Sequence, residues 1–229
     1  MDFKRSLLVI IIIAVAVVYI ADISGFFIKS GVPEANTSRV LAAVEVRNYQ
    51  GERLSSITDF RENSIKGPQH VNMSTYRLEV GGLVTTPLSL TYEDTRILPG
   101  YQKVINLHCV EGWDATILWE GIKVSELINK ADVMPDANTV IFYAYDGYST
   151  SLPLDYIEKN DILLAYGMNN VTLPEDRGYP FQLVAEDKWG YKWIKWVTKI
   201  ELSNDQSYRG YWEQRGYSIG GDTSNAFFA

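Results

Sequence analysis

The sequence has few of the residues that build cross-links and metal sites. Cysteine occurs once, as Cys109, and histidine twice, as His70 and His108, among 229 residues. A single cysteine excludes an intramolecular disulfide, and these three residues alone do not complete a zinc site of the usual Cys and His type. A folded domain of this chain must therefore be stabilised mainly by its hydrophobic core.

Basic blocks and several common enzyme motifs are also missing. Lys and Arg number 21 against 28 Asp and Glu, a formal charge of −7, and the basic residues form no block. Binding to a phosphate backbone needs clustered cations, so a nucleic acid is not the expected partner. The chain contains no G-x-G-x-x-G, P-loop, G-x-S-x-G or H-E-x-x-H motif. These absences exclude the commonest dinucleotide, phosphate-loop, serine-hydrolase and zinc-protease sites.

The N-terminus carries the one long apolar run. Residues 7–21 are 15 apolar residues in succession, preceded by Lys4 and Arg5. A run of this length suits either the core of a signal peptide or a membrane span. Tyr19 stands where signal-peptide cleavage requires a small residue, so we expect an uncleaved membrane anchor.

The positive charges before this run predict the orientation of the chain. By the positive-inside rule they place the N-terminus in the cytoplasm and the remainder outside it, with a cytoplasm-facing domain as the alternative. We expect an anchor over residues 1–30, a polar tether over residues 31–55 and one domain over residues 56–229. About 200 residues suffice for one compact core.

Hydrophobic patterning predicts many short strands and few helices. Helical spacing or capping residues indicate short helices at residues 91–95, 124–131 and 153–159, and a turn is expected at residues 118–121. Alternating or β-branched runs predict strands at residues 75–83, 104–109, 139–145, 162–166, 171–173, 181–185 and 194–202. The absence of regular βα alternation predicts an α+β domain of mostly mixed or antiparallel sheets.

Cys109 is the residue on which the functional argument depends. It ends an apolar strand and is followed by Glu111 and Gly112, so the thiol is expected where a strand becomes a loop. Three roles are open: a buried core residue, a nucleophile assisted by His70, or a ligand to a metal whose other ligands come from a cofactor. His108 is not the assisting base, because adjacent strand residues point to opposite faces.

Five segments, in order, resemble the sulfite oxidase superfamily of molybdopterin-dependent oxidoreductases, and more closely its periplasmic methionine-sulfoxide reductase-like branch. The resemblance covers residues 76–217. Its segments are Cys109-Val-Glu-Gly-Trp113 with Trp119-Glu-Gly121, Leu163-Leu-Ala-Tyr-Gly-Met-Asn169, Leu173-Pro-Glu-Asp-Arg-Gly-Tyr-Pro180, Lys188-Trp-Gly-Tyr-Lys-Trp-Ile-Lys195 and Trp212-Glu-Gln-Arg-Gly-Tyr217.

The resemblance implies a sulfite-oxidase-like molybdopterin-binding fold and assigns roles to particular residues. Cys109 is the expected ligand to molybdenum, or to tungsten, carried by molybdopterin. Tyr217 is the expected catalytic residue, donating a hydrogen bond to a metal oxygen or delivering protons. Residues expected to bind the cofactor are Arg177, Gly190, Lys192 and Lys195. The cations among these would hold its phosphate.

Departures from the family pattern indicate the substrate class. Gln182 stands where the family often has a phosphate-binding arginine, and Glu111 and Trp113 lie where sulfite oxidases have more basic residues. A sulfite dianion needs several arginines, so we expect oxygen-atom transfer on a small S-oxide or N-oxide. Because the chain has no haem motif, electrons are expected from a separate membrane or soluble partner. The alternative is a cofactor-free binding or structural module that keeps the fold.

Overall fold

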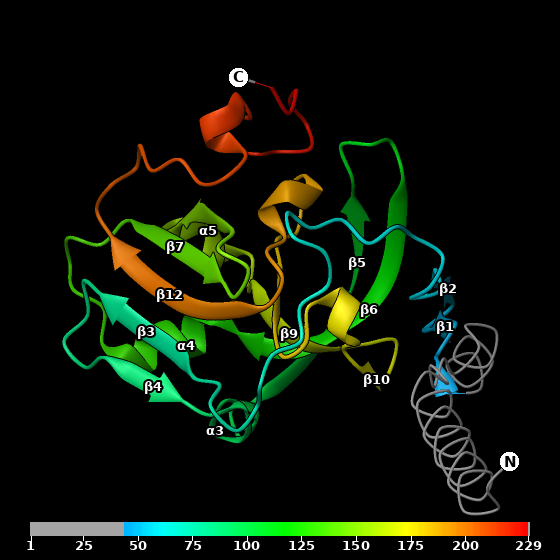
Figure 1. Cartoon of the computed structure of the whole chain (residues 1–229), viewed down its shortest axis with the longest axis horizontal. Helices are drawn as coiled ribbons and strands as arrows, with labels where there is room; N and C mark the ends of the chain where they lie inside the picture. Colours follow the sequence, from blue (N-terminus) through cyan, green and yellow to red (C-terminus); the bar gives the residue numbers. More distant parts are fainter. Residues whose placement is uncertain (1–43, 229) are drawn as a thin grey trace, which may run out of the picture. The chain divides into compact units, whose positions relative to one another are not determined.

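Two five-stranded sheets form the framework of the domain (Figure 1). The structure is a computed structural model and describes residues 44–228. The predicted anchor and the first part of the predicted tether lie outside these residues. Within the described part of the chain, no helix combines the length and the apolar character needed to cross a membrane.

The first sheet has the strand order β10-β9-β6-β5, with β11 also paired to β9. All its pairings are antiparallel, and the longest is the hairpin of β5 and β6. Its strands are β5 (Gly100–His108), β6 (Asp114–Lys123), β9 (Leu163–Met168), β10 (Val171–Thr172) and β11 (Gln182–Val184). The loop that closes the long hairpin carries Cys109, as the sequence predicted for a thiol at the end of a strand.

The predicted turn at residues 118–121 is wrong, because these residues lie inside strand β6. Gly121 pairs with Ala165 next to a register shift in the ladder. A Cβ atom at this glycine would lie 2.4 Å from the carbonyl oxygen of Leu164. The glycine therefore allows two strands to approach closely. In the sequence alone, a glycine with this role looks the same as a glycine in a turn.

The second sheet has the strand order β4-β3-β12-β7-β8 and is mixed, because β3 and β12 run parallel. Its strands are β3 (Leu78–Gly82), β4 (Leu88–Leu90), β7 (Thr139–Ala144), β8 (Ser149–Pro153) and β12 (Val197–Ser203). Strand β12 starts three residues later than the sequence predicted. A 3-10 turn, η2 (Gly190–Lys192), comes before it, and Trp196 has a φ of 53°, which interrupts extended backbone.

The short helices match their predictions closely. Helix α3 (Tyr92–Arg96) starts at Thr91, whose side chain forms a capping box with Asp94. Helix α4 (Val124–Ala131) buries the four residues at helical spacing and contacts β3, β6 and the helix α5 (Leu154–Lys159). Because α4 contacts a strand of each sheet, its apolar face lies within the common core. Two further 3-10 turns are η1 (Glu175–Arg177) and η3 (Glu213–Arg215).

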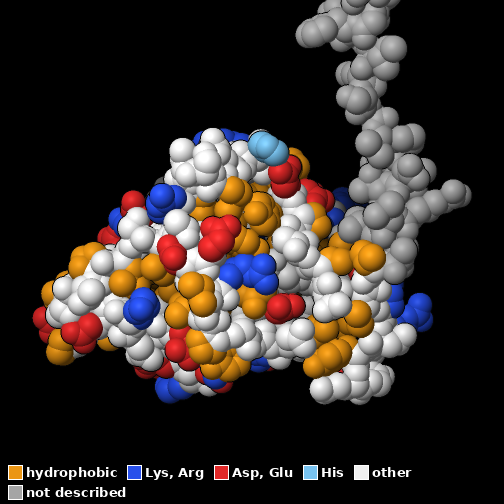
Figure 2. Space-filling model, turned by 90° about the horizontal axis from the view of Figure 1, so that it is seen from below, with side chains coloured by type: hydrophobic (Ala, Val, Ile, Leu, Met, Phe, Trp, Pro, Cys, Tyr) orange, Lys and Arg blue, Asp and Glu red, His pale blue; other side chains and the backbone are white. Residues whose placement is uncertain are grey.

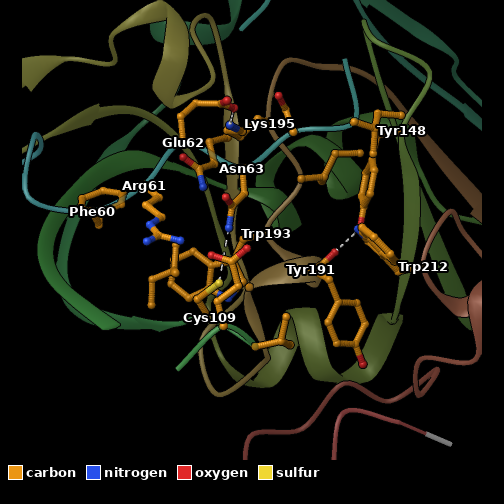
Figure 3. Close-up of a pocket in the computed structure, with 18 of the residues that line it drawn as sticks. Phe60, Arg61, Glu62, Asn63, Cys109, Tyr148, Tyr191, Trp193, Lys195 and Trp212 are labelled. Carbon is orange, nitrogen blue, oxygen red and sulfur yellow. Dashed lines mark hydrogen bonds and ion pairs between the residues drawn. The ribbon is translucent and has the colours of Figure 1, made fainter. Parts of the chain in front are cut away.

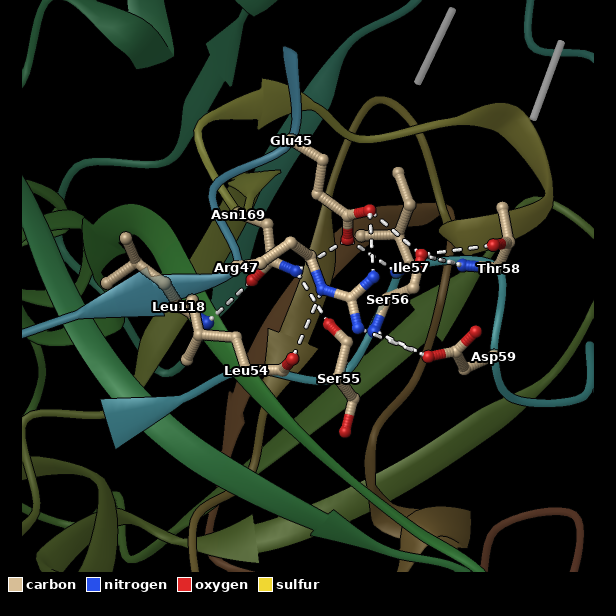
Figure 4. Close-up of polar contacts among 10 residues, drawn as sticks. All are labelled: Glu45, Arg47, Leu54, Ser55, Ser56, Ile57, Thr58, Asp59, Leu118 and Asn169. Atoms are coloured by element: carbon tan, nitrogen blue, oxygen red, sulfur yellow. Dashed lines mark hydrogen bonds and ion pairs between the residues drawn. The ribbon is translucent and has the colours of Figure 1, made fainter. Parts of the chain in front are cut away.

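The end of the predicted tether belongs to the folded domain instead. Residues 48–53 form a hairpin of β1 (Asn48–Tyr49) and β2 (Glu52–Arg53), and the compact unit begins at residue 44. Glu45, with a side chain 1% exposed, accepts hydrogen bonds from Ser56, Ile57 and Asn169 (Figure 4). The residues of this buried polar network do not follow the spacing of apolar residues that marks a strand or a helix. The sequence pattern therefore did not indicate that this segment is folded.

The charged side chains of the domain are mixed in sign. On the face shown in Figure 2, acidic and basic groups are interspersed with hydrophobic ones, and neither sign forms a large patch. This face lacks the basic stripe that a nucleic-acid partner requires.

Candidate functional site

Cys109 begins the loop that joins β5 to β6. Its backbone N–H donates to the carbonyl of Trp113 (2.9 Å), and its own carbonyl accepts from Gly112 (3.1 Å). Gly112 has a φ of 85°, which glycine adopts without strain. The residue is buried, and this burial raises the pKa of the thiol above its ordinary value. The loop therefore fixes the backbone of the cysteine tightly.

The sulfur lies at a cavity of about 430 Å³ (Figure 3). Sites for small molecules and cofactors span about 300–1,000 Å³, so this volume suits a cofactor or a small substrate. The lining comes from the segment 60–67, the end of β5 with the loop after it, the turn between β7 and β8, Gln182, the segment 190–196, Trp212 and Tyr217. Residues far apart in the sequence thus share one cavity.

The segment 60–64 forms the wall nearest the thiol. Asn63 Nδ2 donates to Cys109 Sγ at 3.5 Å, within the range of a hydrogen bond to sulfur. The hydroxyl oxygen of Ser64 is buried and has no hydrogen-bond partner in the protein. A buried polar atom normally has a partner, so this oxygen marks a place where a bound group would be hydrogen-bonded. This segment lies before residues 76–217, over which the sequence resembles the family.

Four of the six predicted site residues line this cavity together. They are Cys109, Gly190, Lys195 and Tyr217. At Gly190 a Cβ atom would lie 3.2 Å from the carbonyl oxygen of His108, a tight contact, so the glycine eases the close approach of this backbone to the cysteine loop. Lys195 forms an ion pair with Glu62 and lies over the Trp196 ring at 4.4 Å.

Neither Lys192 nor Arg177 belongs to the lining of the cavity, and their predicted contact with a cofactor phosphate stays a prediction. The ammonium of Lys192 is fully buried in an ion pair with Glu213 and donates to the carbonyl of Ser151 (3.0 Å). Arg177 donates to the carbonyls of residues 60 and 61 (2.8 and 3.1 Å). Both cations therefore support segments that line the cavity, since their charges are already used within the protein.

Tyr217 belongs to a cluster of aromatic rings at one end of the cavity. Its ring lies 5.0 Å from the rings of Tyr191 and Trp212, and Phe227 and Phe228 lie within 6 Å. Edge-to-face and tilted contacts of this kind fix the orientation of each ring. Tyr217 is thereby held at the cavity by neighbours from two segments.

The turn between β7 and β8 was missed as part of the site. Asp146 and Tyr148 line the cavity, although the sequence Asp146-Gly147-Tyr148 indicated only a turn. Asp146 accepts a hydrogen bond from the Tyr148 backbone (2.9 Å), and the Tyr148 hydroxyl donates to the carbonyl of Tyr191. The only signal in the sequence was the turn pattern Asp146-Gly147, and the burial of Asp146 appears only in the structure.

The lining of the cavity carries charges of both signs, with one more carboxylate than cations. Three carboxylates, Glu62, Glu111 and Asp146, line the cavity against two cations, Arg61 and Lys195. The net formal charge of the lining is therefore −1.

A carboxylate stands beside the thiol itself. The Trp113 indole donates to Glu111 at 3.1 Å. This hydrogen bond, supported by one from Asn63, holds the pKa of Glu111 below its ordinary value. Glu111 is therefore ionised at neutral pH, two residues from the sulfur.

The histidines do not support a nucleophilic role for the thiol. Neither His70 nor His108, both in the described part of the chain, lines the cavity. His70 is paired with Glu175, and its side chain is 84% exposed. The described residues also contain no group of three or more His, Cys, Asp or Glu side chains arranged to bind a metal. The residues present fit a cofactor that brings its own metal ligands, because the lining offers a soft thiol, a lysine and an unpaired hydroxyl.

Comparison with known proteins identifies a family for most of this domain. The family model described as oxidoreductase molybdopterin binding domain matches residues 65–212. This match contains the cysteine loop, the turn between β7 and β8, and the segment that carries Gly190 and Lys195.

Individual relatives and a solved structure agree with this match. The chain is 34% identical to the uncharacterized oxidoreductase YuiH of Bacillus subtilis, over 68% of this chain and 78% of that protein. It is 28% identical to the protein-methionine-sulfoxide reductase catalytic subunit MsrP of Campylobacter jejuni, over 68% of this chain and 58% of that subunit. The crystal structure of the sulfane dehydrogenase SoxCD from Paracoccus pantotrophus has a similar fold, with a TM-score of 0.61, 20% identity, and coverage of 77% of this chain and 54% of the other.

Proposed function

The chain belongs to the oxidoreductase molybdopterin-binding domain family, and from this membership we propose that Cys109 is the protein's thiolate ligand to molybdenum, or tungsten, in a molybdopterin cofactor. The chain is an oxidoreductase, and the resemblance to the sulfite oxidase superfamily is confirmed. The expected α+β fold of mixed and antiparallel sheets is confirmed as well.

The observation that carries the proposal is the position of the only cysteine at the cavity wall. When bound, the cofactor supplies a redox-active metal for two-electron transfer of an oxygen atom. The protein holds the thiol in place through the loop hydrogen bonds to Trp113 and from Gly112. Burial disfavours the free thiolate, whereas a metal charge favours it, so the site is suited to a metal-bound cysteine.

Other residues of the cavity orient the bound groups. Lys195 would contact the cofactor phosphate as a point charge, and the backbone at Gly190 would line the same cavity beside the cysteine loop. Tyr217 presents its hydroxyl as a hydrogen-bond donor to the substrate oxygen. Arg177 and Lys192 would act by positioning the segments around this cavity.

The substrate class that fits the cavity is a neutral S-oxide or N-oxide. A sulfite dianion would be repelled by Glu111 beside the thiol, and the lining carries more carboxylates than cations. Relatives named as protein-methionine-sulfoxide reductase catalytic subunits support the S-oxide class. Electrons would come from a separate partner protein.

Metal analysis tests the assignment of Cys109. The full chain, produced in a host that makes the cofactor, is expected to contain close to one molybdenum or tungsten per chain. Cys109→Ala is expected to lose the metal while keeping the circular dichroism spectrum of the wild type. Metal-free, stably folded wild-type protein would instead support the alternative, a cofactor-free binding or structural module.

A substrate panel tests the chemistry separately. With a reduced dye as the electron donor, dimethyl sulfoxide, methionine sulfoxide and trimethylamine N-oxide are compared as oxidants. Sulfite with an oxidised dye tests the reverse reaction. We expect reduction of at least one S-oxide or N-oxide. Faster turnover of sulfite than of every oxide would contradict the assigned substrate class.

We also propose that residues 1–30 anchor the chain in a membrane with the domain outside the cytoplasm. The apolar run of residues 7–21 behind Lys4 and Arg5 supports this orientation. The full chain is expected in the membrane fraction, resistant to carbonate washing and released by detergent. Its domain is expected to be digested by protease added to spheroplasts, and protection from that protease would contradict the orientation.

A further inference from the structure

The corner of the cavity around Lys195 is already occupied by protein groups. The Lys195 ammonium forms an ion pair with Glu62 (Figure 3). It also donates to the carbonyl of Asp176 at 3.2 Å. The Lys195 side chain is 13% exposed and that of Glu62 is 22% exposed, so both are largely withdrawn from water. An ammonium has three donor hydrogens, and these two contacts leave one for a ligand.

The neighbouring cation does not add free positive charge to this corner. The guanidinium of Arg177 lies 4.1 Å over the Phe60 ring and donates to the carbonyls of Phe60 and Arg61. Its Nε atom is 3.6 Å from the Asp176 carboxylate. The two cations of the corner, Arg177 and Lys195, are therefore matched by two carboxylates, and its formal charge is zero.

The backbone holds this arrangement in place. Gly178 has a φ of 104°, and a Cβ atom there would lie 3.0 Å from Lys195 Cβ. The indole of Trp196 donates to the carbonyl of Glu175 at 2.7 Å. The stem of Lys195 is thus packed against Gly178 and flanked by a fixed ring, so its ammonium has little freedom to leave Glu62.

We propose that Glu62 is a specificity-determining residue that weakens the hold of Lys195 on an anionic phosphate group. Its carboxylate takes one of the donors of the ammonium and repels a second anion at the same place. This inference deepens the proposed function, because it rests on Lys195 as the phosphate contact of a pterin cofactor. A bound cofactor would then be held chiefly by Cys109 and by its fit to the cavity. Its phosphate group would contribute less to binding.

The expected size of the effect follows from partial burial of the pair. Exposed ion pairs have small effects, and buried ones have larger effects. For this intermediate case we expect Glu62→Gln to tighten phosphate binding about tenfold, which corresponds to about 1.4 kcal/mol. The tightening should shrink at high salt, because the repulsion it removes is electrostatic.

Titration calorimetry with inorganic phosphate and pyrophosphate tests this on the full chain made in a host without the cofactor. Glu62→Gln is expected to bind both anions about tenfold more tightly than the wild type. Lys195→Gln is expected to bind them more weakly, and the double variant should show no gain over Lys195→Gln. The matched control is Glu186→Gln, since Glu186 pairs with Lys103, is 33% exposed at its side chain and lies outside the cavity lining.

Two results would overturn the proposal. One is unchanged or weaker anion binding by Glu62→Gln, and the other is an equal gain in the Lys195→Gln background. If the cofactor-free chain does not fold, release of pterin fluorescence from loaded protein replaces calorimetry. Release should then be slower in Glu62→Gln than in wild type, and equal or faster release would refute the proposal. If the wild type binds no metal but Glu62→Gln still tightens anion binding, the result counts only against the proposed cofactor.

Discussion

Replacing Glu45 with glutamine tests whether a buried charge fixes the N-terminal segment of the domain. The Glu45 carboxylate accepts from Ile57 N (2.7 Å), Asn169 Nδ2 (2.7 Å) and Ser56 Oγ (2.8 Å) (Figure 4). Asn169 is fully buried and also accepts from Leu118 N at 3.0 Å. One side chain therefore joins the N-terminal segment to strand β6 and to the turn between β9 and β10.

The magnitude follows from these three hydrogen bonds. A hydrogen bond to a charged group contributes about 1.5–3 kcal/mol, against about 0.5–1.5 kcal/mol for a neutral one. Glutamine keeps the shape, and its amide oxygen can still accept from Ile57 N and Asn169 Nδ2, but its amide nitrogen cannot accept from Ser56 Oγ. Each of the three bonds is therefore weakened or lost at about 1 kcal/mol, and the lower desolvation penalty of an amide offsets part of the loss. We expect Glu45→Gln to lower the free energy of unfolding by about 2 kcal/mol. For a domain of this size, that lowers Tm by about 4–8 °C.

Urea unfolding followed by tryptophan fluorescence measures this loss, and a thermal scan measures the change in Tm. The matched control is Glu52→Gln in the same segment, because Glu52 is exposed on β2 and should change stability by less than about 0.5 kcal/mol. If Glu45→Gln unfolds within about 0.5 kcal/mol of the wild type, the charge does not stabilise the network and the reasoning fails.

Three further predictions concern the core, one strand contact and the thiol. Leu127→Ala should lower the free energy of unfolding by about 2–5 kcal/mol in urea, because Leu127 is fully buried on α4, and a smaller loss would contradict its place in the core. Gly121→Ala should lower the free energy of unfolding by about 1–3 kcal/mol, because the new Cβ atom would clash with the Leu164 carbonyl. Gly81→Ala should lower it less, because the space around Gly81 is open. Equal losses in the two variants would refute the close approach of the strands at Gly121. In metal-free protein, the raised pKa of Cys109 lowers the fraction of thiolate at pH 7–8. Iodoacetamide should therefore modify Cys109 more slowly than a free cysteine, at a rate that rises as pH increases. Rapid modification at pH 7 would favour the nucleophile hypothesis.

Local patterns in the sequence predicted the elements that depend on neighbouring residues. Thr91 and Asp94 cap α3 as expected, because both partners of the capping box lie within one helical turn. The stripe of residues in α4 is buried as expected, since 3.6-residue periodicity reflects a single apolar face. The turn predicted inside β6 was wrong because a glycine that admits a neighbouring strand has the same sequence signal as a glycine in a turn.

The sequence by itself determined the family, the fold class and the importance of the cysteine that lines the cavity, because these depend on ordered local segments. Only the tertiary structure decided which cations face that cavity. Lys192 and Lys195 are three residues apart, yet Lys192 pairs with Glu213 in the interior and Lys195 with Glu62 at the cavity. Their partners lie 21 and 133 residues away. The role of a charge depends on its partner and its burial, and both arise only when distant segments pack together.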